Sequence, residues 1–152
     1  MIPRFITAVL NNEPITIHGN GKSIRDYIHV DDTCEAILKV IKSEKKKIYQ
    51  NTFNIGTGEC FDVNQLSKKI CKIGNYKTKN IKRIINRPGQ VDKHWCNNSK
   101  FNSFFKWRPK IKFSNGLVST FKWYAENRDW WKNKIIEKKI RIVMPNGDIL
   151  YH

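Results

Sequence analysis

The sequence predicts a small mixed α/β domain of short strands and about five helices. Its 152 residues, 39% hydrophobic and 12% aromatic, suit one domain with one apolar core. Segments with apolar residues at helical spacing alternate with short extended segments, and turns rich in glycine, proline or asparagine separate them. The strands are too few to form a complete doubly wound sheet.

The first predicted helix covers residues 2–11, and Pro3 suits its first turn. Its apolar face consists of Ile2, Phe5, Ile6, Val9 and Leu10. Residues 15–18 are expected to form a short strand, followed by a tight turn at Gly19-Asn20-Gly21, whose residues tolerate a positive φ. A second extended segment is predicted at residues 25–30.

Two further helices are predicted in the middle of the chain. Asp31 or Asp32 is expected to cap the first of them. Its predicted inward face consists of Cys34, Ile37, Val40 and Ile41. A buried strand follows at residues 52–56, and the next helix is capped by Asp62 and ends at Gly74.

The remaining predicted elements complete one domain over residues 1–131. Residues 82–86 form an extended segment and residues 98–106 a short helix. Ser114 is expected to cap a last helix that runs through Trp131.

Residues 132–152 are predicted to form a basic C-terminal tail with a β-hairpin. Two extended segments, residues 140–144 and 148–151, flank Pro145-Asn146-Gly147. An Asn-Gly pair between two such segments is typical of a hairpin turn. We therefore expect this tail to be separate from the preceding domain.

The composition argues against several classes of protein. No apolar stretch approaches the roughly 20 residues of a membrane span, and the first residues lack a signal-peptide pattern, so we expect a cytoplasmic protein. The four cysteines form no Cys-x-x-Cys pair, which argues against a zinc site. We expect four reduced thiols, with Cys34 and Cys71 on apolar helical faces.

A net charge of +16 raises the question of a nucleic-acid partner, because basic surfaces attract phosphate backbones. Only seven of the 29 basic residues are arginine, although arginine is the favoured reader of bases and phosphates. The lysines are dispersed among polar residues, as on ordinary solvated faces. Nucleic-acid binding is therefore the less favoured interpretation.

Two arginines stand beside tight turns, which suggests a site for a diphosphate. Arg25 follows the Gly19-Asn20-Gly21 turn, and Arg87 begins Arg87-Pro88-Gly89-Gln90. A pyrophosphate is best held by planar bidentate donors that keep their charge. The alternative is that Arg25 pairs locally with Asp26 and that Arg87 is an exposed loop residue.

These segments belong to a longer set of motifs that occur in one order. The set is Gly19-Asn20-Gly21, Arg25-Asp26-Tyr27-Ile28-His29-Val30-Asp31-Asp32, Phe53-Asn54-Ile55-Gly56-Thr57-Gly58, Arg87-Pro88-Gly89-Gln90-Val91-Asp92, Lys100, Trp107-Arg108-Pro109, Gly116-Leu117 and Trp123-Tyr124 through Trp130-Trp131. It resembles the C-terminal, substrate-binding half of the extended short-chain dehydrogenase/reductases, the NAD-dependent epimerase/dehydratase family. Within that family the resemblance is closest to dTDP-glucose 4,6-dehydratase, with UDP-glucose 4-epimerase and UDP-glucuronate decarboxylase nearby.

The resemblance implies roles for five residues. Arg25 and Arg87 would hold the phosphates of a nucleotide-diphosphate sugar, and Tyr27 would lie beside the first arginine. Gln90 takes a place where relatives often carry an Asp or His that contacts the ribose. Asp62 takes the place of a substrate-binding Asn in some dehydratases, although its position also suits a helix cap.

The cofactor and catalytic motifs of that family are missing from this sequence. Neither Gly19-x-Gly21 nor Gly56-x-Gly58 has the third glycine of a dinucleotide-binding turn. No tyrosine is followed four residues later by the lysine that makes it a base. We expect no catalytic residue and no NAD binding in this chain, with the NAD-binding Rossmann half lying upstream or on a split partner chain.

The predicted function is the substrate-binding portion of an NAD-dependent nucleotide-sugar 4,6-dehydratase-like enzyme that acts on dTDP- or UDP-glucose. The alternatives are part of a 4-epimerase or decarboxylase, a nonenzymatic binding module, and a basic nucleic-acid binder. The surface that packs against the missing half should be bare. We expect it to include part of the apolar stripe of Ile2, Phe5, Ile6 and Val9, and to cause self-association or poor solubility.

Overall fold

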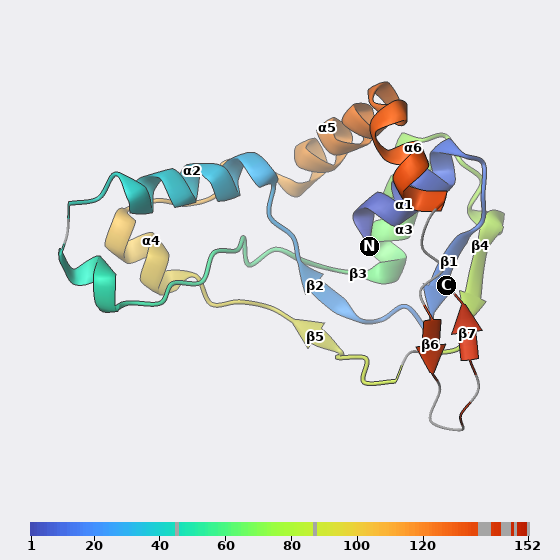
Figure 1. Ribbon diagram of the computed structural model, residues 1–152, viewed down its shortest axis with the longest axis horizontal. Coiled ribbons are helices and arrows are strands. Elements are labelled where there is room, and N and C mark those ends of the chain that lie inside the picture. Colours follow the sequence, from blue (N-terminus) through green and yellow to red (C-terminus); the bar gives the residue numbers. More distant parts are fainter. Residues whose placement is uncertain (45, 87, 137–140, 144–146, 148, 152) are drawn as a thin grey trace.

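The computed structural model describes residues 1–152 apart from residues 45, 87, 137–140, 144–146, 148 and 152 (Figure 1). The helices of the described part are α1 (Ile2–Leu10), α2 (Val30–Ile41), α3 (Val63–Ile73), α4 (Ser99–Phe105), α5 (Phe113–Glu126) and α6 (Arg128–Ile136), with short 3-10 helices η1 (Lys46–Gln50) and η2 (Thr78–Asn80). Its strands are β1 (Ile15–His18), β2 (Ile24–Asp26), β3 (Cys60–Asp62), β4 (Ile81–Ile84), β5 (Lys93–His94), β6 (Arg141–Val143) and β7 (Ile149–Tyr151). The predicted mixed α/β class is confirmed.

The strands form three small sheets. β1 pairs with β4 in parallel, with Ile15 opposite Ile81. β2 is the middle strand of the second sheet, antiparallel to β3 and parallel to β5. β6 and β7 form an antiparallel pair, whereas most of the predicted turn between them lies outside the described residues.

The main core lies where α1, α3 and α5 pack together beside β1 (Figure 1). Its buried members are Phe5, Ile6, Ala8, Val9, Ile15, Ile17, Val63, Leu66, Ile70, Cys71 and Leu117. The expectation that the apolar face of α1 is bare is therefore wrong. That face is buried because α3 and α5, which come from later in the sequence, both pack against α1.

A second, smaller cluster lies between α2 and α4, at the other end of the molecule (Figure 1). Its buried members are Ala36, Phe101 and Trp107, and Phe53 and Ile55 pack against them. The predicted inward face of α2 is right only at Val40, which packs against this cluster. Cys34, Ile37 and Ile41 are exposed, because α2 turns Ala36 and Val40 toward the cluster and these three residues away from it.

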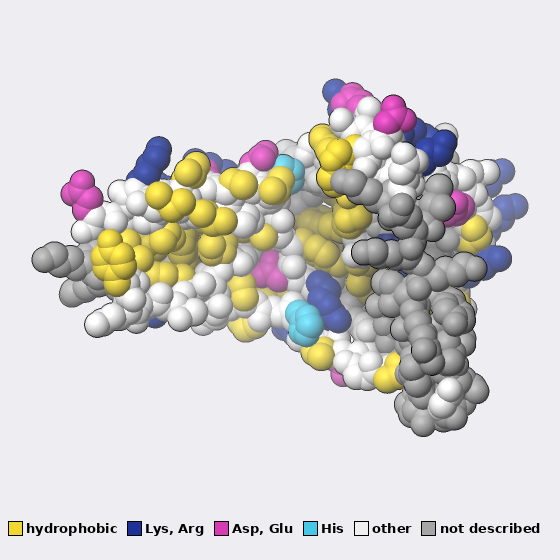
Figure 2. All heavy atoms as spheres, viewed as in Figure 1, with side chains coloured by type: hydrophobic (Ala, Val, Ile, Leu, Met, Phe, Trp, Pro, Cys, Tyr) yellow, Lys and Arg dark blue, Asp and Glu magenta, His cyan; other side chains and the backbone are white. Residues whose placement is uncertain are grey.

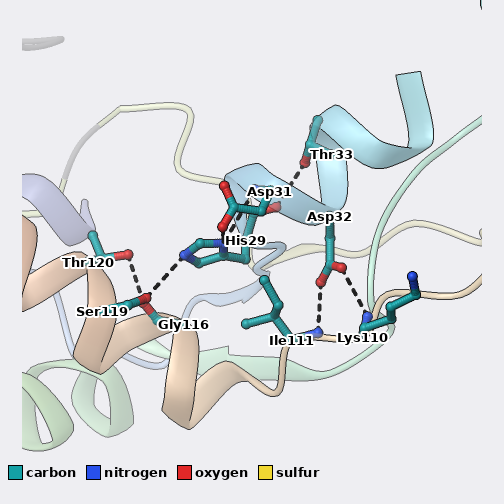
Figure 3. Close-up of polar contacts among 9 residues, drawn as sticks. All are labelled: His29, Asp31, Asp32, Thr33, Lys110, Ile111, Gly116, Ser119 and Thr120. Atoms are coloured by element: carbon teal, nitrogen blue, oxygen red, sulfur yellow. Dashed lines mark hydrogen bonds and ion pairs between the residues drawn. The ribbon is translucent and has the colours of Figure 1, made fainter. Parts of the chain in front are cut away.

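Helix ends agree with prediction in some places and differ in others. Asp62 caps α3 in a reciprocal capping box with Gln65, and Gly74 ends the same helix, both as predicted. α2 is capped by His29 rather than by an aspartate. The side chain of Asp32 is instead bonded to the segment before α5. Its buried carboxylate accepts hydrogen bonds from the backbone N–H groups of Lys110 and Ile111, both at 3.0 Å (Figure 3).

The last predicted helix is divided in two. α5 begins at Phe113 after Lys112, so Ser114 lies inside its first turn and is not the cap. α5 ends before Asn127 and α6 starts at Arg128, which accounts for one α-helix more than the five expected. Trp131 of α6 still folds back, since its indole N–H donates to the carbonyl of Tyr124 at 2.8 Å.

The strand predicted at residues 52–56 is not present as a strand. The segment has no strand partner among the described residues, and β2 instead pairs with β3, which the sequence analysis missed. A strand is defined by its ladder, so extended side-chain patterning alone does not produce one. The unpaired segment runs from η1 to β3 across the middle of the molecule (Figure 1).

Candidate functional site

Arg25 lies at the centre of β2, where the backbone fixes the direction of its side chain. Its guanidinium donates to the carbonyls of Ile24 and Val91, at 2.7 and 2.9 Å. Among the described residues it forms no ion pair, so the alternative of a local pair with Asp26 is wrong. The positive charge of Arg25 is thus held in place without being neutralised.

Asp26 has another role, which explains the glycines of Gly56-Thr57-Gly58. Its carboxylate accepts from the N–H and hydroxyl of Thr57, at 3.1 and 2.6 Å, and from the N–H of Gly58 at 3.0 Å. A Cβ at Gly56 would lie 2.7 Å from Asp26 Oδ2 and would clash with Cys96 Sγ, so glycine is favoured there. The motif therefore ties the segment before β3 to β2.

A cavity of about 250 Å³ opens beside Arg25, between α1, β1 and β2. It is lined by Met1, Arg4, Phe5, Thr16, Ile17, His18, Arg25, Val63 and Gln90. Two guanidinium groups and an imidazole border this cavity, and none of the described residues that line it is acidic. Such an arrangement favours an anion.

Gln90 reaches this cavity from the loop that follows β4. Its side-chain amide donates to the hydroxyl of Ser23 at 3.0 Å, which places it next to the start of β2. Arg87 lies outside the described residues. The turn after it is described, and Gly89 there has a φ of +67°, a conformation that favours glycine.

Tyr27 and Asp62 do not line the cavity of Arg25. Tyr27 lines a neighbouring cavity of about 270 Å³ and donates to Met1 Sδ at 3.5 Å, so Met1 lies between the two. Burial raises the pKa of Tyr27, and the nearby charge of Arg25 lowers it by less. Asp62 accepts from the N–H of Gln65 at 2.7 Å, so its carboxylate is engaged as a helix cap.

Arg4 and His18 are members of the site that the sequence analysis missed. Arg4 donates to the hydroxyl of Thr16, and His18 Nδ1 donates to the carbonyl of Ile85 at 3.0 Å. The signal for His18 was present, because β1 alternates buried isoleucines with Thr16 and His18 on its other face. Arg4 directly follows Pro3, on a helix whose other members suggested only a core.

Other classes of site have no support in the described part of the chain. No group of three or more metal-ligating side chains comes together there. No described helix is long and apolar enough to cross a membrane. All four cysteines are free thiols, and Cys71 is buried in the main core as expected.

The sequence model of the GDP-mannose 4,6 dehydratase family matches residues 1–120. The chain belongs to this family. The predicted resemblance to dTDP-glucose 4,6-dehydratase and the related extended short-chain dehydrogenase/reductases is thereby confirmed.

Individual relatives agree with this assignment. A trifunctional UDP-glucose 4,6-dehydratase/UDP-4-keto-6-deoxy-D-glucose 3,5-epimerase/UDP-4-keto-L-rhamnose-reductase of Arabidopsis thaliana is 31% identical over 97% of this chain and 22% of its own length. A dTDP-glucose 4,6-dehydratase of Bacillus anthracis, solved in complex with NAD, superposes with a TM-score of 0.79 at 29% identity. A UDP-glucose 4-epimerase of Thermotoga maritima, solved with UDP-glucose, superposes with a TM-score of 0.76 at 30% identity.

The chain spans only part of each relative. The two superpositions cover 87% and 84% of this chain, but only 41% and 40% of the solved proteins. The family is therefore established for this chain, whereas the activity of a whole enzyme does not follow from the match alone.

Proposed function

We propose that this chain binds the nucleotide-diphosphate sugar of an NAD-dependent 4,6-dehydratase-like enzyme, with dTDP- or UDP-glucose as substrate. The observation that carries this proposal is the cavity beside β2. Arg25 and Arg4 border it with His18, and the part of its lining that the structure describes includes no carboxylate. A diphosphate has the charge and the hydrogen-bond acceptors that such a lining favours.

Arg25 is suited to be one arm of a diphosphate clamp. Two of its N–H groups already bond to the carbonyls of Ile24 and Val91. A guanidinium has five such donors in a planar fork, so donors remain for a phosphate oxygen. Arg87, three residues before Gln90, supplies the second arm, and the Gln90 amide contacts the ribose.

The two other predicted site residues, Tyr27 and Asp62, have smaller roles in this proposal. Tyr27 lines the neighbouring cavity and donates to Met1 Sδ, and burial raises its pKa, so its hydroxyl remains a donor. Asp62 contributes through α3, since its carboxylate is already engaged with the Gln65 N–H. Its neighbour Val63 provides part of the apolar wall of the cavity.

In the complete enzyme the reaction is oxidation at C4 of the hexose, loss of water across C5 and C6, and return of the hydride. NAD, bound to the part of the fold that this chain does not span, supplies the hydride chemistry. This chain contributes affinity and orientation, because a substrate held by its diphosphate presents its sugar in one position.

Ligand-observed NMR with dTDP-glucose and UDP-glucose tests the clamp in wild type, Arg25→Lys, Arg87→Lys and the double variant. Loss of either fork should weaken binding by about tenfold or more, and lysine should not restore it. Lys132→Ala is the control for general basicity and should bind like wild type. If both single variants also bind like wild type, the clamp is wrong.

A 4-epimerase is the second candidate, because the Thermotoga maritima epimerase superposes nearly as well as the dehydratase. The clamp would serve either reaction, so the two candidates share the binding prediction. The salt dependence of binding distinguishes a polyanion binder from these two candidates. Its affinity would fall steeply as salt rises and would show no preference between nucleotides, whereas a pocket prefers one nucleotide.

A further inference from the structure

Half of the net positive charge of this chain comes from one stretch of its sequence. Residues 63–91 contain eight Lys or Arg and no Asp or Glu, whereas residues 1–62 contain eight residues of each sign. The net charge of residues 63–91 is therefore +8, out of +16 for the whole chain. The basic residues are interspersed with acidic ones in the first part of the sequence, but not in this stretch.

These basic residues lie on α3, η2 and β4, which are neighbours in the structure. The N–H of Tyr76 donates to the carbonyl of Cys71 at 2.8 Å, which holds the segment before η2 against the end of α3. The guanidinium of Arg83 on β4 donates to Asn64 Oδ1 at 3.0 Å, which ties β4 to the first turn of α3. Figure 2 shows Lys and Arg side chains projecting along the edge of the molecule that β4 and the segment before it occupy in Figure 1.

The lysines of these three elements form an exposed basic surface, which we call the α3–β4 face. α3 turns Leu66 and Ile70 into the main core, so its lysines remain on the outside. Every lysine of the face is exposed, and none forms an ion pair with another described residue. The members of the α3–β4 face are Lys68, Lys69, Lys72, Lys77, Lys79 and Lys82.

Charge that is not neutralised within the chain favours an anionic partner. Lys68 and Lys72 are one turn apart on α3, and like charges at that spacing repel each other. An anionic polymer removes this repulsion and at the same time releases the counterions that it carried. The α3–β4 face therefore gains more from such a polymer than a surface of mixed charge would.

The composition of the face favours a nucleic-acid duplex over other polyanions. No large apolar side chain of residues 63–84 is exposed, so the face has none to insert into a lipid surface. Protein interfaces favour aromatic residues and Arg over Lys, whereas a phosphate backbone needs only exposed cations. Tyr76 is half-buried and donates to the carbonyl of Glu13, so it is not available to stack on unpaired bases.

We propose that the α3–β4 face binds the phosphate backbone of double-stranded nucleic acid without sequence preference. The scarcity of Arg in this chain argues against reading of bases, and a backbone contact does not need it. None of the six lysines lines the cavity beside Arg25. The inference is therefore independent of the proposed function, because the two sites use different residues.

Fluorescence anisotropy with a labelled duplex of about 20 base pairs tests the face in the complete chain. Affinity should fall as salt rises from about 50 to about 200 mM, because cations compete for the phosphates. Lys68→Gln/Lys72→Gln should weaken binding about tenfold and make the logarithmic salt slope shallower by about 2. Duplex DNA and duplex RNA should behave alike, since both offer the same backbone charge.

Two control variants remove the same charge elsewhere. Lys42→Gln/Lys106→Gln removes it near α2 and α4, at the other end of the molecule, and Lys138→Gln/Lys139→Gln removes it from the C-terminal tail. Both should bind the duplex within about threefold of wild type.

A third variant separates charge from shape. Lys68→Arg/Lys72→Arg should bind like wild type, because a backbone contact needs the charge and not a particular fork. The Gln and Arg variants of the face should keep the wild-type melting temperature, since both replaced side chains are exposed and Lys, Arg and Gln have similar helix propensities.

Equal weakening by Lys68→Gln/Lys72→Gln and by either control would overturn the proposal, because net charge alone would then set the affinity. Absence of duplex binding up to about 100 μM protein at about 50 mM salt would also overturn it. So would tighter binding to a single strand of the same length, or to phosphatidylserine vesicles, than to the duplex. Arg25→Lys separates the two proposals, because it should weaken nucleotide-sugar binding and leave duplex binding unchanged, whereas Lys68→Gln/Lys72→Gln should do the reverse.

Discussion

The two apolar clusters of this molecule differ in how far the chain alone completes them. The cluster around α1, α3 and α5 has 11 buried members and is enclosed by elements from both halves of the sequence. The cluster between α2 and α4 has three, and the helix that covers it carries a bare apolar face. The first cluster is a closed core, whereas the second is small and is covered by a helix whose other side is exposed.

The same contrast appears in the backbone. β1 has a full parallel partner in β4, with Ile15 to His18 opposite Ile81 to Ile84. The segment at residues 53–55 has strand-like side chains and no ladder. Stability should therefore reside in the closed core, while the α2 region contributes less because fewer of its side chains are buried.

A matched pair of leucines should show the largest difference between the regions. Leu66 is 0% exposed in the closed core and Leu38 is 50% exposed on α2. Leu66→Ala should lower the free energy of unfolding by about 2 to 5 kcal/mol. Leu38→Ala should change it by about 0.5 kcal/mol or less. Urea denaturation followed by circular dichroism measures both, and equal losses would show that α2 is not bare in solution.

Asp32 tests what holds α2 to the rest of the molecule. Its buried carboxylate accepts from the N–H groups of Lys110 and Ile111 (Figure 3). Asp32→Ala leaves these two donors without their acceptor, and hydrogen bonds to a charged group are worth about 1.5 to 3 kcal/mol each. We expect a loss of about 2 to 4 kcal/mol in the free energy of unfolding.

Asp31→Ala is the control for the charge of the same helix turn, because the Asp31 side chain is 74% exposed. It should cost well under about 1 kcal/mol, since it removes an exposed charge near a helix start and a surface contact with His29, whose Nδ1 lies 3.4 Å from the carboxylate. If the two variants lose equal stability, the hydrogen bonds of Asp32 do not join α2 to the segment before α5.

The sequence was sufficient for the fold where local signals decide the structure. β1 has the predicted limits, and α3 begins and ends at the predicted Asp62 and Gly74, because capping chemistry and periodicity agree there. It was insufficient for α2, since a helix with two apolar stripes gives no sign of which one faces its own chain. It was also insufficient for residues 52–56, because strand formation depends on a partner.

The sequence likewise predicted some residues of the candidate site and missed others. Arg25 and Gln90 do line one cavity, although the clamp itself stays a prediction because Arg87 lies outside the described residues. Asp62 is a cap, as the residue pattern favoured. Arg4 and His18 were missed because only the packing of α1 over β1 brings them to Arg25, and that packing is not encoded in any single motif.

The smallest predicted effect is on the stability of the closed core at alkaline pH. Tyr27 and Tyr124 pack against that core, and burial raises the pKa of both. An unfolded tyrosine titrates near pH 10, so the folded state keeps its proton to higher pH than the unfolded state. The stability that these tyrosines contribute is therefore complete below about pH 10 and is lost as the pH rises through the folded pKa.

Replacing these hydroxyls should flatten the alkaline loss of stability. The variant Tyr27→Phe/Tyr124→Phe should lose less stability than wild type between about pH 9 and pH 11, because phenylalanine has no proton to release. Tyr49→Phe, at a side chain that is 88% exposed and outside both clusters, is the control and should follow wild type. Urea midpoints at several pH values measure the slopes, and only differences between variants are compared because the many lysines titrate in the same range. A double variant with the wild-type slope would show that neither tyrosine is more shielded in the folded chain than in the unfolded one.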